Sequence, residues 1–131
     1  MKAISTTAAP AAIGPYSQAI IHGGTLYVSG QLPIDPVIGS FSSEDPAEQI
    51  RQCLANIAAI AKAAGTDMAH CLKTTVLVSD LSRFAEINAV YASFFSEPFP
   101  ARATFEVSRL PKDAQVEIEA VFALPGQAGS A

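Results

Sequence analysis

The sequence predicts an α+β fold in which a mixed β-sheet carries two helices packed on one face. Three observations lead to this prediction. The chain has 131 residues, a length that suits a single domain with one core. Segments 44–65 and 81–95 repeat apolar residues at helical spacing, whereas five other segments are typical of strands. The order of these elements along the chain is ββαβαββ, which favours helices gathered on one side of a sheet.

The first two strands are expected at Ser17–Ile21 and Thr25–Ser29. Gly23 and Gly24 lie between them and indicate a hairpin turn. The segment that follows, residues 33–41, contains two prolines and a glycine, so a loop is expected there. No strand is predicted before residue 17.

The first helix is the clearest element. Asp45 is the expected N-cap, Pro46 fits the first helical position, and Glu48 completes a capping box. Gly65 is the expected residue just after the helix end. One face of this helix carries an apolar stripe, formed by Ile50, Cys53, Leu54, Ile57, Ala61 and Ala64.

A strand rich in β-branched residues is expected over 70–80, and Asp80 can cap the element that follows. The second helix then runs within 81–95 and is ended by two prolines. Asn88 shares or borders the apolar face of this helix, which is formed by Phe84, Ile87, Tyr91 and Phe94.

The last two strands are joined by the short segment "RLPKDA", so they are expected to pair antiparallel. In the final strand one face is apolar, formed by Val116, Ile118, Ala120 and Phe122, with Glu117 and Glu119 opposite. In the strand before it, Ala103, Phe105 and Val107 are expected to face the helices. The opposite sheet face would then carry Arg102, Thr104, Glu106, Glu117 and Glu119. That face could meet water or another subunit, and the fold alone does not decide.

Composition excludes several classes of protein. The net charge is −4 and the basic residues are scattered, which argues against a nucleic-acid partner. No segment approaches the roughly 20 apolar residues of a membrane helix, and the N-terminus lacks a signal-peptide stretch. A cytoplasmic protein without a membrane partner is therefore expected.

Cys53 and Cys71 are expected to be buried free thiols. Together with His22 and His70 they show no metal-site spacing, so no metal is predicted. The small, polar tail at 125–131 is expected to fray, and residues 1–131 are expected to form one domain.

Four segments carry a family resemblance: "AAIGPYSQA" at 11–19, "LYVSGQLP" at 26–33, "NAVYASFF" at 88–95 and "FPARATFEVSRLPKDAQVEIEA" at 99–120. Together they resemble the Rid family, also called YjgF, and within it the RidA subgroup of reactive intermediate deaminases. The resemblance implies a chorismate-mutase-like homotrimer whose sheet faces pack around the threefold axis and whose sites lie between subunits.

The implied activity is hydrolysis of 2-imino acids, such as 2-iminobutanoate and 2-iminopropanoate, or their enamine tautomers, to 2-keto acids and ammonia. These imines are released by pyridoxal-phosphate enzymes that dehydrate serine or threonine. The resemblance implies no cofactor and no metal.

Two residues match catalytic positions of the family. Arg102 matches a carboxylate-binding arginine, because a guanidinium presents a planar fork of donors to a carboxylate. The residue alone also allows an ion pair with Glu106 or Glu119. Glu117 matches a glutamate that holds the attacking water, since an electrophilic iminium carbon needs little beyond a placed water. The alternative for Glu117 is a solvated or salt-bridged carboxylate.

Four more residues match positions beside the ligand. Tyr16 would line the cleft, and Ser29 and Gly30 would offer a hydroxyl and a backbone N–H. Asn88 would place an amide near the site. Each has an ordinary alternative: a packed tyrosine, a turn serine, or an asparagine bonded to backbone.

Thr104 is a departure, because RidA-type members often carry a cysteine two residues after the arginine. Threonine keeps a hydrogen-bonding atom for the substrate-binding set but cannot form a thiolate. Thr104 therefore leaves open a second function, a regulatory or chaperone-like protein that binds a keto acid without turnover. A third, the endoribonuclease activity attributed to some relatives, is disfavoured by the acidic charge.

Overall fold

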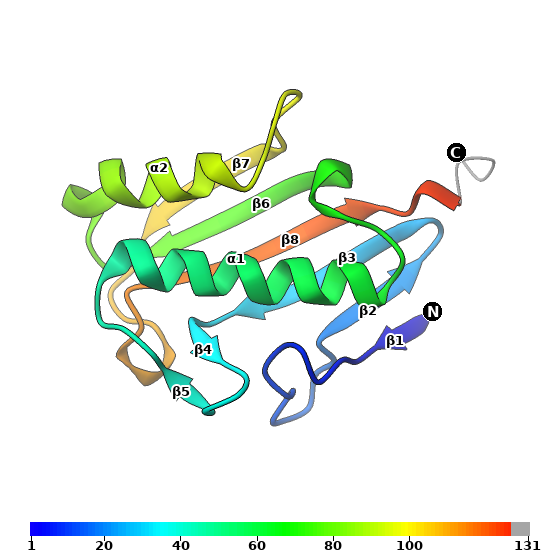
Figure 1. Ribbon diagram of the computed structural model, residues 1–131, viewed down its shortest axis with the longest axis horizontal. Coiled ribbons are helices and arrows are strands. Elements are labelled where there is room, and N and C mark those ends of the chain that lie inside the picture. Colours follow the sequence, from blue (N-terminus) through cyan, green and yellow to red (C-terminus); the bar gives the residue numbers. More distant parts are fainter. Residues whose placement is uncertain (127–131) are drawn as a thin grey trace.

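The computed structural model describes residues 1–126, which form a six-stranded mixed sheet and two α-helices (Figure 1). The strands follow the order β1 (Lys2–Ile4), β2 (Ala19–His22), β3 (Thr25–Gln31), β8 (Val116–Ala123), β6 (Cys71–Val78) and β7 (Ala101–Glu106). All neighbours pair antiparallel except β6 and β7. Helices α1 (Pro46–Ala63) and α2 (Phe84–Ser93) lie on the same face of the sheet, which confirms the predicted α+β class.

The core lies between this sheet face and the helices. The predicted stripe of α1 is confirmed, since Ile50, Cys53, Leu54 and Ile57 are at most 1% exposed. They pack with the predicted apolar face of β8, formed by Val116, Ile118, Ala120 and Phe122. Each large side chain buried here contributes roughly 1.5–3 kcal/mol relative to exposure. Within residues 1–126, neither α-helix has the length and apolar character that a membrane crossing requires.

The two ends of α1 differ from each other in how well they were predicted. Pro46 occupies the start of the helix as expected, but the capping box is wrong. The Asp45 side chain makes no cap hydrogen bond, and the Asp45 N–H donates to Ser43 Oγ at 3.0 Å, so Glu48 is not its partner. At the other end Gly65 has φ +88°, and the Thr66 N–H donates to the Ala61 carbonyl at 3.0 Å, which confirms the glycine-terminated end.

Three short strands were not predicted. β1 pairs with β2, and β4 (Ile34–Asp35) pairs with β5 (Ser40–Phe41) inside the segment expected to be a loop. Strands of two or three residues are too short to show an alternating pattern. The second helix also begins later than predicted, because Leu81–Arg83 forms a 3₁₀ turn in which Ser82 N–H donates to Asp80. Of the tail expected to fray, residues 127–131 lie outside the described residues.

The predicted pairing of the last two strands is wrong. β8 lies between β3 and β6, so β7 takes the sheet edge and pairs parallel with β6. The parallel register places Arg102 beside Thr74 and Thr104 beside Val76. Because Thr74 and Val76 are 1% exposed beneath the helices, Arg102 and Thr104 also face the helices. Phe105 is instead 55% exposed on the opposite face, so the predicted orientation of this strand is inverted.

Buried amides on α1 fasten the loops near the sheet ends. Asn56 Nδ2 donates to the carbonyls of Leu32 and Ile34, at 3.2 and 2.9 Å. Gln49 Oε1 accepts from the Gln115 N–H at 2.8 Å. Leaving any of these buried groups unpaired costs about 1–3 kcal/mol, so α1 fixes the chain just after β3 and just ahead of β8.

Candidate functional site

The predicted site residues other than Thr104 gather in two separate hollows. The first, which we call the Arg102 hollow, has a volume of about 390 Å³ and is lined by Asn88, Tyr91, Ala92, Phe99, Pro100 and Arg102. The second, the Glu117 hollow, has about 560 Å³ and is lined by Tyr16, Ser29, Gly30 and Glu117 together with Ala11, Ile13, Leu32, Ile34, Pro111 and Lys112. Each hollow thus contains one of the two predicted catalytic residues.

In the Arg102 hollow the guanidinium is held by α2. Arg102 Nη1 donates to Asn88 Oδ1 at 2.7 Å. The guanidinium carbon lies 4.9 Å from the centre of the Tyr91 ring and 5.2 Å from that of Phe84. Among residues 1–126, Arg102 forms no ion pair with Glu106 or Glu119, which excludes that alternative within the described chain. The Nε and Nη2 donors accordingly remain available to a carboxylate.

In the Glu117 hollow the carboxylate lies against the backbone of Gly30. A Cβ atom at Gly30 would come within 2.5 Å of Glu117 Oε2. Gly30 sits where the β3–β8 register shifts between Val28 and Gln31, so a bulge brings this backbone close to β8. The glycine is needed here for close approach rather than for a left-handed backbone.

Burial and a neighbouring charge both act on Glu117. Its half-buried position raises the pKa of Glu117 above the ordinary value, and the carboxylate of Glu119 raises it further. A raised pKa makes the ionised carboxylate a stronger proton acceptor, which suits a group that draws a proton from water.

Ser29 and Tyr16 shape the wall of the Glu117 hollow. Ser29 Oγ donates to the Ser17 carbonyl at 2.6 Å, so this hydroxyl can only accept a further hydrogen bond. The bond ties β3 to the segment that carries Tyr16, whose N–H donates to the Gly14 carbonyl at 2.9 Å. Tyr16 as a residue is 53% exposed and lies at the edge of the hollow.

The two hollows lie on different faces of the sheet. Arg102 faces the helices, whereas Glu117 pairs with Leu77 and faces away from them, as predicted for Glu117. Strand β6 runs between β7 and β8, and the hollows share no lining residue. The expectation that Arg102 and Glu117 share one face of one chain is wrong, because within a protomer the two side chains lie on opposite faces of the sheet.

Thr104 lines neither hollow. Its Oγ1 is buried and has no hydrogen-bond partner among the described residues. Conversely, three aromatic residues around Arg102 were not predicted as site residues: Phe84, Tyr91 and Phe99. The spacing of Tyr91 from Asn88, three residues along one helix, was the signal that could have identified it.

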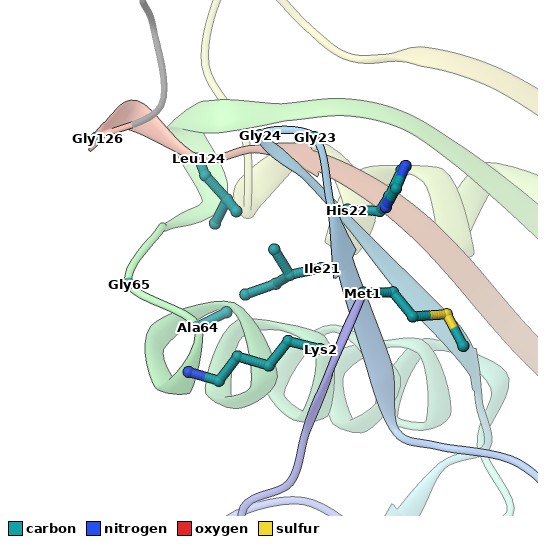
Figure 2. Close-up of a pocket in the computed structure, with 10 residues that line it drawn as sticks. All are labelled: Met1, Lys2, Ile21, His22, Gly23, Gly24, Ala64, Gly65, Leu124 and Gly126. Carbon is teal, nitrogen blue, oxygen red and sulfur yellow. The ribbon is translucent and has the colours of Figure 1, made fainter. Parts of the chain in front are cut away.

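A larger hollow of about 600 Å³ lies by β1, the sheet edge remote from β7 (Figure 2). Ile21 and Leu124 extend into it, while the side chain of His22 points away (Figure 2). It contains none of the predicted site residues. Residues 1–126 also hold no cluster of three or more His, Cys, Asp or Glu side chains that could bind a metal ion.

Comparison with known proteins finds similarity along nearly the whole chain. A family model described as Endoribonuclease L-PSP matches residues 6–124. RutC family protein y4sK from Sinorhizobium fredii is 62% identical over 92% of this chain and 96% of its own length. The 2-iminobutanoate/2-iminopropanoate deaminase of Bos taurus is 50% identical over 92% of this chain and 88% of its own length. The crystal structure of RidA from the Antarctic bacterium Psychrobacter has a TM-score of 0.90 at 44% identity, covering 94% of this chain and 99% of that one.

The buried hydroxyl of Thr104 predicts that Thr104→Val stabilises the fold by about 1 kcal/mol, because an unpaired buried hydroxyl is removed with little change in volume. The matched control is Thr74→Val on the neighbouring strand. The Thr74 hydroxyl is hydrogen-bonded to Tyr91 at 2.7 Å, so this change is expected to destabilise the fold. Urea denaturation at one protein concentration measures both free energies of unfolding. Two changes of the same sign would contradict the assignment.

Proposed function

The chain belongs to the Rid family, described as Endoribonuclease L-PSP, and we infer that it is a 2-iminobutanoate/2-iminopropanoate deaminase. The observation that carries this conclusion is the 50% identity to the bovine deaminase over 92% of the chain. The matched region includes both hollows, and the groups in each suit one half of an imine hydrolysis: an anion-binding fork and a water-holding base.

In this proposal Arg102 binds the substrate carboxylate. Asn88 occupies Nη1, which leaves Nε and Nη2 side by side for two parallel charge-assisted hydrogen bonds. Such a pair orients the imino acid and selects against imines that lack a carboxylate, because the guanidinium would then lose its partner. Phe99 and Pro100 form the apolar rim against which a short side chain such as the ethyl group of 2-iminobutanoate would lie.

Glu117 acts on the water. The water oxygen bonds to the iminium carbon, the C=N π electrons move to nitrogen, and Glu117 accepts the proton that the water releases. Glu117 then gives this proton to the amino nitrogen of the carbinolamine. The C–N bond breaks with its electron pair on nitrogen, the hydroxyl proton moves to Glu117, and the O–H electron pair forms the C=O bond of the keto acid. That proton passes to ammonia, so the products are a 2-keto acid and ammonium, with no cofactor or metal required.

A trimer unites the two half-sites in this proposal. Because Arg102 and Glu117 face opposite sides of one sheet, we place the Arg102 hollow of one protomer against the Glu117 hollow of the next. Head-to-tail contacts of this kind close into a ring when the rotations between successive protomers add up to a full turn. Exposed apolar side chains on the face away from the helices, Tyr27 at 49% and Phe105 at 55%, support packing around a threefold axis in a chorismate-mutase-like homotrimer.

The remaining predicted residues take lesser roles. Tyr16 closes the Glu117 hollow with an apolar ring, Ser29 accepts a hydrogen bond from the water, and Gly30 makes room for the carboxylate. Thr104 takes no direct part in this scheme, because its hydroxyl is buried outside both hollows. The imines would come from pyridoxal-phosphate enzymes that dehydrate serine or threonine. We place the reaction in the cytoplasm, where the two buried thiols of Cys53 and Cys71 would stay reduced.

The proposal predicts that the protein accelerates ammonia release when it is added to a threonine dehydratase reaction. Arg102→Ala should lower kcat/KM by about a hundredfold or more, because a desolvated carboxylate loses its charge partner. Arg51→Ala is the control, since its exposed pair with Glu48, at 3.4 Å, lies on α1 outside both hollows.

Three results would contradict this assignment. Full activity in Arg102→Ala would show that Arg102 does not bind the substrate carboxylate. Tight 2-ketobutyrate binding by calorimetry without any acceleration of imine decay would instead indicate a keto-acid-binding regulator. Cleavage of RNA by the unmodified protein would indicate the endoribonuclease of the family description, which an acidic chain of net charge −4 disfavours.

A second prediction separates activity from stability. Gly30→Ala should push aside the end of the flexible Glu117 side chain, so activity should fall by about a hundredfold while the free energy of unfolding changes by less than about 1 kcal/mol. Gly65→Ala should do the reverse. An alanine held at the φ of +88° found there is strained, so the free energy of unfolding should fall. The new Cβ meets no neighbour within 4 Å and lies outside both hollows, so activity should be retained. Steady-state kinetics and urea denaturation on both variants measure the contrast. Equal activities in the two would refute the close contact of Gly30 with Glu117.

A further inference from the structure

We propose that Tyr91, assisted by Phe84, is a positioning residue that holds the Arg102 guanidinium in the orientation needed to bind the substrate carboxylate. The inference rests on the proposed function. It assigns to α2 a role beyond packing, because aromatic side chains of this helix support the guanidinium of Arg102, which belongs to β7.

The support is a single face of α2. Phe84, Asn88 and Tyr91 are spaced four and three residues apart, so they line up along one side of the helix. All three contact the same guanidinium. Asn88 Oδ1 accepts from Nη1 at 2.7 Å, and the two rings lie 5.2 and 4.9 Å from the guanidinium carbon, within the range of cation–π attraction.

Arg102 needs such support because of where it lies. It is an exposed residue near the start of β7, the edge strand of the sheet. A long side chain at such a position samples many rotamers, and fixing it on binding a ligand opposes affinity. Two rings and an amide that hold the guanidinium beforehand remove most of that penalty.

The Tyr91 ring is itself fixed. Its hydroxyl and Thr74 Oγ1 are 2.7 Å apart, and Tyr91 and Thr74 are 5% and 1% exposed. The Phe95 ring lies against it, with centroids 4.8 Å apart. Thr74 is also the register partner of Arg102 across β6 and β7. Tyr91 is therefore hydrogen-bonded to the residue that pairs with Arg102, and its ring contacts the Arg102 guanidinium itself. Burial raises the pKa of Tyr91, which is consistent with a protonated phenol that is hydrogen-bonded to Thr74.

The expected consequence concerns binding more than chemistry. The Arg102–carboxylate pair is present in both the bound substrate and the transition state, so a loosened guanidinium weakens both alike. Such a loss raises KM and leaves kcat nearly unchanged. A merely structural role for Tyr91 would instead lower stability and the yield of active protein without changing KM.

The experiment compares Tyr91→Leu with Tyr91→Phe, using KM for the imine and Kd for 2-ketobutyrate by calorimetry. Tyr91→Leu removes the ring, and both constants should rise about tenfold while kcat stays within about threefold. Tyr91→Phe keeps the ring and should restore both constants to within about threefold of the unmodified protein. Phe84→Leu, at a half-buried position, gives a second test should Tyr91→Leu fail to fold, with an expected rise of a few-fold.

A double-mutant cycle makes the test specific. In an Arg102→Ala background, Tyr91→Leu should leave the residual Kd unchanged, since the guanidinium that it positions is gone. Unchanged KM and Kd in Tyr91→Leu, or an equal effect with and without Arg102, would overturn the inference. The binding readout keeps it apart from the proposed function: a protein that binds 2-ketobutyrate but hydrolyses no imine defeats only the deaminase assignment, and the Kd values still decide the role of Tyr91. A protein that neither binds nor hydrolyses overturns both.

Discussion

The parallel register of β7 on β6 is the constraint on which the rest of the site depends. By pairing Arg102 with Thr74, it turns the guanidinium toward α2, where Asn88 and Tyr91 hold it. The antiparallel register of β8 on β6 turns Glu117 to the other face. One protomer therefore carries these two groups on opposite faces of its sheet, and the proposed reaction depends on the assembly of protomers to bring them together.

Sequence periodicity was sufficient to predict the long elements that face the core, but it was insufficient to predict the orientation of the strand at the sheet edge. The stripe of α1 and the alternation in β8 are imposed by a core that buries them, so both were predicted. The rule that apolar residues face the core failed for β7. Its polar residues Arg102, Thr104 and Glu106 lie on the sheet face that holds the buried residues of β6, such as Thr74 and Val76. β7 does alternate, but its polar residues lie on the side of the helices, where this edge strand is only partly covered.

Motifs supplied the candidate site residues, but not their arrangement in space. They singled out Arg102, Asn88, Glu117 and Gly30 as candidates, and nothing in the residue pattern indicates that these residues divide between two hollows. The supporting rings were missed because Phe84 and Tyr91 have the spacing of ordinary core residues, and only the position of Arg102 gives them a second task. Gly30 gives room to the Glu117 carboxylate, whereas the buried Thr104 hydroxyl, which has no hydrogen-bond partner among the described residues, has no evident benefit in the structure.

The central claim, that one active site takes Arg102 from one protomer and Glu117 from its neighbour, can be tested most directly by mixing two inactive variants. Arg102→Ala and Glu117→Gln chains, unfolded together and refolded, form mixed rings at random. Interfaces that combine the intact Arg102 of one chain with the intact Glu117 of the next should recover about a quarter of the unmodified deaminase activity. A mixture that stays as inactive as its parents, although mass spectrometry shows mixed trimers, would contradict the account.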